Sequence, residues 1–211
     1  MWAQAMPSVM LPNMWTEEFY PIFFTVFQIS WAFVWAARHI EIRKGRRYAD
    51  NRARGDTNSR YKVVSYFLFI LQNILCLASF WSNSQLLLKI HDSNSMRFAG
   101  VILISLATVL YFKALARLGR NYSPCFDSHL PFELISSGPY KFTRHPMYFA
   151  KLIIAIGDFV LSGSLWFLAI FMYLMLETVR TIAKEEKYLG ESVQGYDSYR
   201  KRTARMIPFV F

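Results

Sequence analysis

The sequence contains little cysteine, and its cysteines form no recognisable framework. Only two of the 211 residues are cysteines; Cys76 lies in an apolar run and Cys125 in a polar segment, so they give neither a disulfide framework nor a metal-ligand spacing. The four histidines show no ligand spacing on any one helix, and we therefore predict no metal site. Residues 1–15 contain neither Lys nor Arg, so they lack the basic leading region of a signal peptide, and we expect the first apolar run to stay in the mature protein.

Acidic residues are also scarce, and their shortage is uneven along the chain. There are 14 Asp and Glu against 24 Lys and Arg, which gives a formal net charge of +10. Residues 38–62 hold nine Lys or Arg against three acids, whereas residues 82–97 hold only Lys89 and Arg97. No basic-aromatic module is visible, so we expect no nucleic-acid partner. Basic loops of membrane proteins stay in the cytoplasm and contact anionic lipids, and we interpret the asymmetry as a signal of topology.

Apolar and aromatic residues are abundant and lie in long runs. The chain is 54% hydrophobic and 18% aromatic. Five runs approach the ~20 residues that cross a bilayer core, and they cover roughly residues 20–37, 63–81, 98–118, 147–162 and 165–179. The last two are short and are separated by Ser162-Gly163-Ser164, so we expect them to form a helical hairpin. The predicted fold is an all-α integral membrane protein with about five transmembrane helices.

The charge asymmetry assigns an orientation to these five helices. With basic loops inside, the N-terminus lies outside and the C-terminus lies in the cytoplasm. Residues 1–112 would form the N-terminal spans with a basic cytoplasmic loop, and residues 113–211 a catalytic hairpin with a cytoplasmic C-terminal segment, all in one integrated domain. Residues 184–199 are expected to continue the fifth span as an amphipathic helix.

The segment Ser137–Tyr148 has the composition of a binding site at the membrane surface. Proline disfavours helical geometry in the residue before it, so His145 should be extended and Pro146 should open the fourth helix. Arg144 and His145 would then lie beside a helix N-terminus, where free N–H groups favour an anion. Tyrosine rings can flank a cation, and two are present here, Tyr140 and Tyr148. A carboxylate together with a cation matches the amino-acid half and the sulfonium of S-adenosylmethionine, although other anions would also fit.

The hairpin should bring Glu185 and Glu186 to the same place. Pro146 is 17 residues before Gly163 and Glu185 is 22 after it. At ~1.5 Å per residue, Glu185 should lie about 8 Å beyond Pro146, just outside the bilayer. Its carboxylate would accept hydrogen bonds from ribose hydroxyls or from an ammonium group. The alternative is a solvated helix face paired with the neighbouring lysines.

Two further charges fall inside the apolar zone of the hairpin. Lys151 is 12 residues before Gly163 and Glu177 is 14 after it, so they lie at nearly the same depth. Isolated charges at that depth cost on the order of 2.5–3.5 kcal/mol each. We therefore expect Lys151 and Glu177 to pair across the hairpin, with Arg180 as a second partner for Glu177. Alternatively, Lys151 extends to the inner interface and Glu177 pairs only with Arg180.

A set of short motifs follows in order through the C-terminal half. They are Leu118-Gly119-Arg120-Asn121-Tyr122-Ser123-Pro124, Leu134-Ile135-Ser136-Ser137-Gly138-Pro139-Tyr140, Arg144-His145-Pro146-Met147-Tyr148, Glu185-Glu186, Tyr196-x-x-Tyr199 and Ile207-Pro208. This ordered set, in about residues 113–208, resembles the isoprenylcysteine carboxyl methyltransferase family and its phospholipid N-methyltransferase relatives.

The resemblance implies a membrane enzyme that binds S-adenosylmethionine on the cytoplasmic side and methylates a lipophilic or lipidated acceptor. It implies that Gly138, Pro139, Tyr140, His145, Pro146, Tyr148, Glu185 and Glu186 enclose the cofactor. It further places Arg144 and Arg205 near the acceptor, and with Glu185 these are the expected catalytic residues.

The acceptor is left open, because three positions depart from the family pattern: Phe132, Ala150 and Ser192-Val193. A carboxylate of the prenylcysteine type is the first expectation, and it needs a cation rather than a base. A phospholipid amine would need a base, for which Glu185 or a tyrosine could serve, and a lipophilic thiol is a third candidate. Two other classes remain: an NADPH-dependent sterol-type reductase, which shares an Arg-His-Pro-x-Tyr segment, and a non-enzymatic membrane scaffold.

Overall fold

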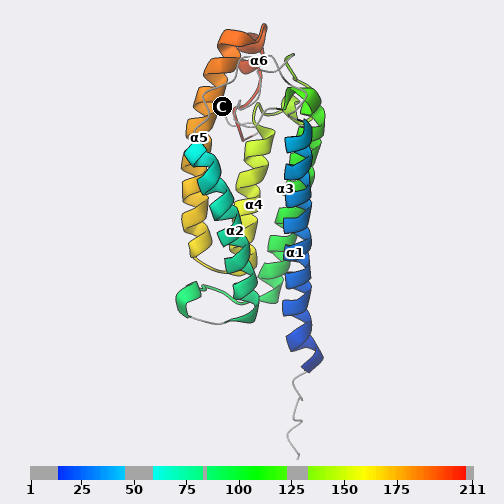
Figure 1. Cartoon of the computed structure of the whole chain (residues 1–211), viewed down its shortest axis with the longest axis vertical. Coiled ribbons are helices and arrows are strands. Elements are labelled where there is room, and N and C mark those ends of the chain that lie inside the picture. The colour runs from blue at the N-terminus through cyan, green and yellow to red at the C-terminus, as the bar shows by residue number, and fades with distance from the viewer. Residues whose placement is uncertain (1–13, 46–58, 83–84, 123–132, 208–211) are drawn as a thin grey trace, which may run out of the picture.

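Five long helices run side by side and account for most of the chain (Figure 1). The computed structural model describes residues 14–45, 59–82, 85–122 and 133–207. The long helices are α1 (Met14–Gly45), α2 (Ser59–Trp81), α3 (Asn94–Leu118), α4 (Pro146–Ser162) and α5 (Trp166–Ser192). The short elements are the 3-10 turns η2 (Gln85–Leu87), η3 (Gly119–Asn121) and η5 (Gly138–Lys141), and helix α6 (Tyr196–Arg200). The described part of the chain contains no strand, only isolated bridges, so the predicted all-α class is confirmed.

The connection between α2 and α3 meets the turn between α4 and α5 at one end of the bundle (Figure 1). Ile90 N donates to Gly163 O at 2.8 Å, and Ser164 Oγ donates to Leu87 O at 2.5 Å. Gly163 has φ 68°, and a Cβ there would lie 2.3 Å from His91 O, so glycine is required at this turn. The predicted hairpin is therefore present, and its open end points away from this turn.

Helices α3 and α4 approach closely because glycines line their contact. A Cβ on Gly100 would lie 2.6 Å from Leu161 N, and a Cβ on Gly157 would lie 2.6 Å from Ile104 Cγ1. Small residues let helix backbones come together, as they do between membrane helices. This contact fixes the position of α4 along the bundle axis relative to α3. It therefore also places the polar segment before α4 next to the C-terminal end of α3.

Polar side chains join the other helices inside the bundle. Gln72 of α2 donates to the fully buried Asp158 of α4. Gln28 of α1 donates to Asn73 of α2 at 3.0 Å. Near the hairpin turn, Arg97 is 5% exposed and donates to Ser79 O at 3.3 Å. Buried polar groups of this kind need partners, and these pairs hold the helices in one register.

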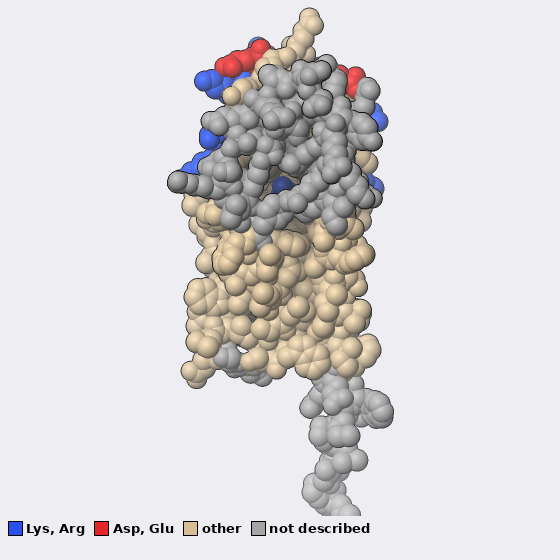
Figure 2. Space-filling model, in the orientation of Figure 1, with Lys and Arg blue, Asp and Glu red and all other residues tan. Residues whose placement is uncertain are grey.

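Three helices are long and apolar enough to cross a membrane, and these segments are Phe19–Ala37, Asn94–Leu118 and Trp166–Ser192. Large apolar side chains such as Phe33 and Leu106 are exposed on α1 and α3, at 71% and 66%. On the face that Figure 2 shows, a wide band carries no charged side chains, and the visible charges gather at the end that carries α6. Helix α4, with 17 residues, and the apolar part of α2, Phe67–Trp81, are shorter. The count of five spans thus stays a prediction, and much of the basic loop, residues 46–58, lies outside the described residues.

Candidate active site

The segment before α4 folds into a compact turn over the open end of the hairpin. Gly138 has φ 63° and is the first residue of η5. Pro139 is its second residue. The N–H groups of Phe142 and Thr143 both bond to Pro139 O. His145 then caps α4 with φ −126° and ψ 55°, so its backbone is non-helical but not extended as predicted. Pro146 opens the helix, as the sequence predicted.

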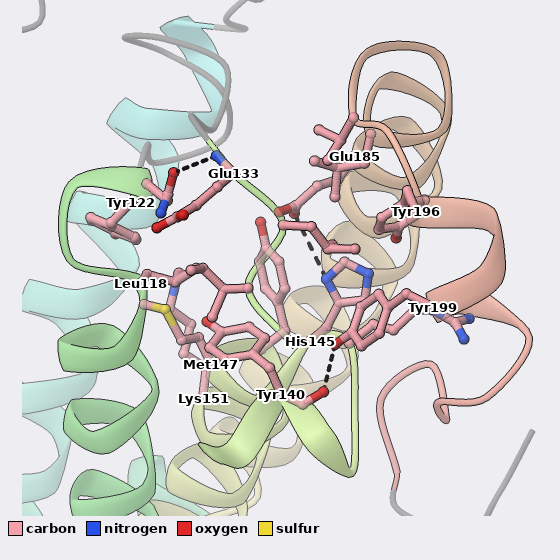
Figure 3. Close-up of a pocket in the computed structure, with 17 residues that line it drawn as sticks. Leu118, Tyr122, Glu133, Tyr140, His145, Met147, Lys151, Glu185, Tyr196 and Tyr199 are labelled. Carbon is pink, nitrogen blue, oxygen red and sulfur yellow. Dashed lines mark hydrogen bonds and ion pairs between the residues drawn. The ribbon is translucent and has the colours of Figure 1, made fainter. Parts of the chain in front are cut away.

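This turn, α3, α5 and α6 together surround a pocket (Figure 3). Five of the predicted site residues line it: Tyr140, Arg144, His145, Tyr148 and Glu185. The walls come from segments far apart in the sequence, so the pocket exists only in the folded hairpin. Polar groups from η5, α4 and α5 converge on one side. The side toward α3 mixes apolar and polar side chains, which are Leu118, Asn121, Tyr122, Glu133, Leu134 and Ile135.

Glu186 anchors the polar side from behind the pocket. It is 4% exposed, and its Oε1 accepts from Arg144 Nε at 2.8 Å and lies 3.4 Å from His145 Nε2. Its Oε2 accepts from Arg205 Nη2 at 2.8 Å and from Arg205 Nε at 3.0 Å. Arg144 Nη1 also donates to the carbonyl oxygens of Arg200 (2.8 Å) and Thr203. One carboxylate therefore ties the segment after α6 to the start of α4.

Glu185 faces the pocket on the other side of the same imidazole. His145 Nδ1 lies 4.0 Å from Glu185 Oε2, a separation too long for a hydrogen bond (Figure 3). Glu185 Oε2 is buried, and no hydrogen-bond partner for it lies among the described residues. The predicted meeting of the His-Pro segment with the two glutamates is thus confirmed, while their binding role stays a prediction.

Three tyrosines complete the polar wall as neutral phenols. Tyr199 Oη donates to Tyr140 O at 2.6 Å, and burial raises the pKa of Tyr199 to about 12. Burial also raises the pKa of Tyr140 and of Tyr196 well above 10, with smaller contributions from the charges of Glu185 and Glu186 respectively. Tyr196 Oη is buried, and the described part of the chain offers it no hydrogen-bond partner. These hydroxyls therefore keep their protons at neutral pH and can donate.

Among the described residues, Lys151 is the cation that lines the pocket on the side toward α3 (Figure 3). Its Nζ lies 5.3 Å from the ring centroid of Tyr148 and 5.9 Å from that of Tyr111. Glu177 instead accepts from Arg180 Nη1 at 2.7 Å. The expected ion pair of Glu177 with Arg180 is thus confirmed. The expected pair of Lys151 with Glu177 is not among the ion pairs of the described residues, and Lys151 lines the pocket instead.

The remaining predicted residues shape the site without lining it. Gly138 and Pro139 form η5, Pro146 is buried at the start of α4, and Glu186 and Arg205 form the ion pair behind the wall. Sequence reasoning singled out the motifs but did not assign the other lining residues, which are Leu118, Asn121, Tyr122, Glu133, Leu134, Ile135, Met147, Lys151, Leu189, Val193, Tyr196 and Tyr199. Several of these residues lie in the motifs quoted above, and membership of a motif was the one indication in the sequence that they line the pocket. Among the described residues, no three His, Cys, Asp or Glu side chains are grouped as metal ligands would be.

Comparison with known proteins agrees with this geometry. Residues 95–193, from the start of α3 to the end of α5, match the phospholipid methyltransferase family. The predicted resemblance is therefore confirmed for the part of the chain that builds most of the pocket. A curated relative is the nickel-cobalt-cadmium resistance protein NccN of Alcaligenes xylosoxydans xylosoxydans, which is 29% identical over 96 residues. That match covers 44% of this chain and 45% of the relative, so it spans less than half of either protein.

Proposed function

We propose that this chain is a membrane methyltransferase that uses S-adenosylmethionine to methylate a lipophilic acceptor. The observation that carries the proposal is a pocket into which two buried polar atoms, Glu185 Oε2 and Tyr196 Oη, face without a hydrogen-bond partner among the described residues. Buried polar atoms in native proteins are generally bonded, so such a pair indicates a missing polar ligand. The family match over residues 95–193 indicates that the ligand is a methyl donor.

The residues present fit that cofactor. Glu185 Oε2 can accept from its ammonium group or from a ribose hydroxyl, and Tyr196 Oη can donate to a carboxylate or to a ring nitrogen. His145 and the free N–H groups that begin α4 favour the cofactor's carboxylate. The ring of Tyr148, 5.8 Å from the His145 ring, offers a face to a cation. Glu186 holds His145 and Arg144 in place and does not itself reach the pocket.

The reaction needs positioning more than acid–base chemistry. When bound, S-adenosylmethionine supplies an electrophilic methyl group, so that an acceptor carboxylate oxygen forms a C–O bond to it while the C–S bond breaks, the electron pair stays on sulfur and no proton moves. Groups that hold two reactants in line supply much of the rate of such a displacement. Arg144 and Arg205 serve here as positioning residues, because both guanidinium groups bind Glu186 and that of Arg144 also binds backbone carbonyls.

We further propose that all five long helices cross the membrane, with the pocket on the cytoplasmic side. Their alternating direction puts the C-terminal ends of α1 and α3, together with α6, at one end of the bundle (Figure 1). Arg38, Arg43 and Lys44 belong to this end of α1, and Arg60 and Lys62 belong to the start of α2. Positive loops stay inside, where S-adenosylmethionine is made and where it would enter the pocket from water.

Direct ligand binding tests this proposal. Radiolabelled S-adenosylmethionine should bind the detergent-purified protein, and NADPH should not. Glu185→Gln should weaken that binding at least about tenfold, as expected for a lost partner of a charged group. Glu191→Gln is the matched control, because Glu191 is an exposed residue of the same helix that does not line the pocket. NADPH binding without S-adenosylmethionine binding would point to the reductase class, and binding of neither would point to a scaffold.

A further inference from the structure

We propose that the outer face of α5 binds an anionic phospholipid of the cytoplasmic leaflet through a basic stripe formed by Arg180, Lys184 and Lys187. The inference rests on the transmembrane arrangement proposed above and does not depend on which acceptor is methylated. None of the three side chains lines the pocket, so this lipid is a partner of the helix bundle and not the methyl acceptor.

The basic stripe follows one face of α5 for more than two turns. Tyr173, Glu177 and the three basic residues are spaced by four, three, four and three positions, which places neighbours along one side of a helix. All three basic residues are exposed, whereas Glu186, which turns toward the bundle, is 4% exposed. One side of α5 thus contributes to the pocket, and the other presents its charges outward.

The stripe begins at the height where the membrane surface is expected. Arg180 is 17 residues after Gly163 and Pro146 is 17 residues before it, so both lie about 25 Å from the hairpin turn. Lys184 and Lys187 lie about 6 and 10 Å farther along the helix. In the proposed arrangement, the three cations therefore extend through the layer that holds the lipid headgroups.

Apolar side chains continue this surface toward the membrane interior. Met172, Leu176 and Val179 are exposed and lie beside the line of the stripe on α5. Acyl chains can pack on such a surface, while long basic side chains lie along it and place their charges in the headgroup layer. The two parts together match an amphiphile that has an anionic head and long apolar tails.

The charges of this face favour a phosphate. Arg180 Nη1 donates to Glu177 Oε1 at 2.7 Å, yet the Arg180 side chain is 70% exposed. A guanidinium group has five N–H donors, so it can bind a phosphate while it keeps this ion pair. Among the described residues, no ion pair involves Lys184 or Lys187. The next acid on this face, Glu191, lies one turn beyond Lys187, so the stripe keeps a net positive charge at the leaflet.

The same charges argue against a second copy of the chain as the occupant. A two-fold symmetric contact between copies brings the same patch of both molecules together. The basic stripes would then approach one another, and like charges repel most strongly where little water separates them. An anionic lipid instead neutralises the stripe and covers the apolar side chains next to it.

Native mass spectrometry of the full chain, purified in detergent, counts the lipids that each molecule retains and gives their affinity. The probes are dioleoylphosphatidylglycerol, which is anionic, and dioleoylphosphatidylcholine, which has the same tails and no net charge. The thermal unfolding midpoint in the presence of each lipid is a second readout. Inorganic phosphate, added as a competitor, distinguishes a lipid from a soluble anion.

Three variants locate the binding site. The stripe variant combines Arg180→Gln, Lys184→Gln and Lys187→Gln. The partial variant keeps the Glu177–Arg180 ion pair and combines only Lys184→Gln and Lys187→Gln. The control removes the same charge as the stripe variant from exposed residues in and directly after α6, which do not line the pocket, and it combines Arg200→Gln, Lys201→Gln and Arg202→Gln.

We expect the unchanged protein to bind phosphatidylglycerol at least tenfold more tightly than phosphatidylcholine, and to unfold at a higher temperature when phosphatidylglycerol is present. The stripe variant should lose at least tenfold in affinity for phosphatidylglycerol and the partial variant at least threefold, with lipid-free unfolding unchanged in both. The control should stay within twofold of the unchanged protein. Added salt should weaken the binding of phosphatidylglycerol, because it screens exposed charges.

Several outcomes would overturn the lipid site. Equal affinity of the unchanged protein for the two lipids is one, and equal losses in the stripe variant and the control are another, since they would reflect net charge alone. Competition by inorganic phosphate would assign the stripe to a soluble anion, and a dimer that depends on the stripe would assign it to a second copy. Protein that stays soluble without detergent would instead overturn the membrane arrangement, and none of these results bears on S-adenosylmethionine binding.

Discussion

The carboxylate of Glu186 contacts three side chains of the candidate site, which its place in the Glu185-Glu186 motif did not predict. Its two oxygens meet Arg144, Arg205 and His145, while its side chain is 4% exposed. A buried carboxylate is tolerated because its partners offset the loss of hydration. Removing its charge leaves two guanidinium groups without their main partner, so the effect should reach both stability and the shape of the pocket.

The first prediction concerns this carboxylate. Glu186→Gln should lower the free energy of unfolding by about 3 kcal/mol, near the range for breaking a buried ion pair. It should also weaken S-adenosylmethionine binding, because His145 loses its support. Thermal unfolding in detergent, with Glu191→Gln as control, measures the first effect and calorimetry the second. A stability within about 0.5 kcal/mol of the unchanged protein would contradict it.

Two neighbouring tyrosines allow a cleaner separation of binding from folding. Tyr199 Oη donates to Tyr140 O at 2.6 Å, whereas Tyr196 Oη is buried and lacks a hydrogen-bond partner within the described residues. We predict that Tyr199→Phe lowers the free energy of unfolding by about 1 kcal/mol, the usual net value of one hydrogen bond. Tyr196→Phe should leave stability unchanged or slightly higher, yet weaken cofactor binding roughly two- to tenfold. Thermal unfolding measures the stability of both variants and calorimetry measures their cofactor binding. Lower stability with unchanged cofactor binding in Tyr196→Phe would show that Tyr196 has no ligand to bind.

At the scale of elements, the contact between α3 and α4 sets the depth of the site. A Cβ on Gly157 would lie 2.6 Å from Ile104 Cγ1, and overpacking of this kind typically costs 1–3 kcal/mol, so we predict about 2 kcal/mol for Gly157→Ala. Adding Ile104→Ala should make the double variant more stable than the sum of the two changes implies. Gly190→Ala in α5 is the control, since its nearest new contact is Asp197 Oδ1 at 3.9 Å, and it should be neutral or stabilising. A double-mutant cycle by thermal unfolding tests the coupling, and strict additivity would argue against a direct contact.

The helices themselves could be predicted, but their ends could not. Apolar runs indicated the apolar parts of α1 and α5, whereas both helices extend beyond those runs, to Gly45 and Ser192. A run of apolar residues marks the part of a helix that lipid can solvate. The helix continues past that run as long as its backbone N–H and C=O groups remain hydrogen-bonded. The amphipathic helix expected over residues 184–199 is instead broken before α6, where Gly195 adopts φ 83°. That break lets Tyr196 and Tyr199 turn back to the pocket.

The part of the site that the sequence motifs form could be predicted. The His-Pro start of α4 and the two glutamates meet as expected, because antiparallel helices of known rise fix relative height. The sequence placed Lys151 at the depth of Glu177 and predicted that the two pair, but the ion pair that the structure gives Glu177 is with Arg180. Equal depth is compatible with many angles around a helix, and only the packed bundle shows that Lys151 turns to Tyr111 and Tyr148 rather than to Glu177.

For the whole molecule, the two ends of the bundle should lie on opposite sides of the membrane. Ser95 is exposed at the hairpin-turn end, and Ser198 is exposed on α6 at the pocket end. In a Cys125→Ser background, we predict that Ser95→Cys reacts in intact cells with a thiol reagent that cannot cross membranes. Ser198→Cys should react only after the membrane is made permeable. The reverse pattern would place the pocket outside, and labelling of both without permeabilisation would argue against a transmembrane bundle.

The shortness of α4 has a consequence for how a lipid substrate would be handled. Its 17 residues measure about 25 Å, less than the ~30 Å of a bilayer core, while α3 and α5 are longer. In the proposed transmembrane arrangement, the floor of the pocket would lie below the membrane surface, between taller walls. Drawing an acyl or prenyl chain into water costs about 0.8 kcal/mol per methylene, or roughly 8 kcal/mol for ten. In that arrangement, the cofactor would descend to the acceptor and the tail would stay dissolved in lipid, so the extraction penalty would not enter the barrier.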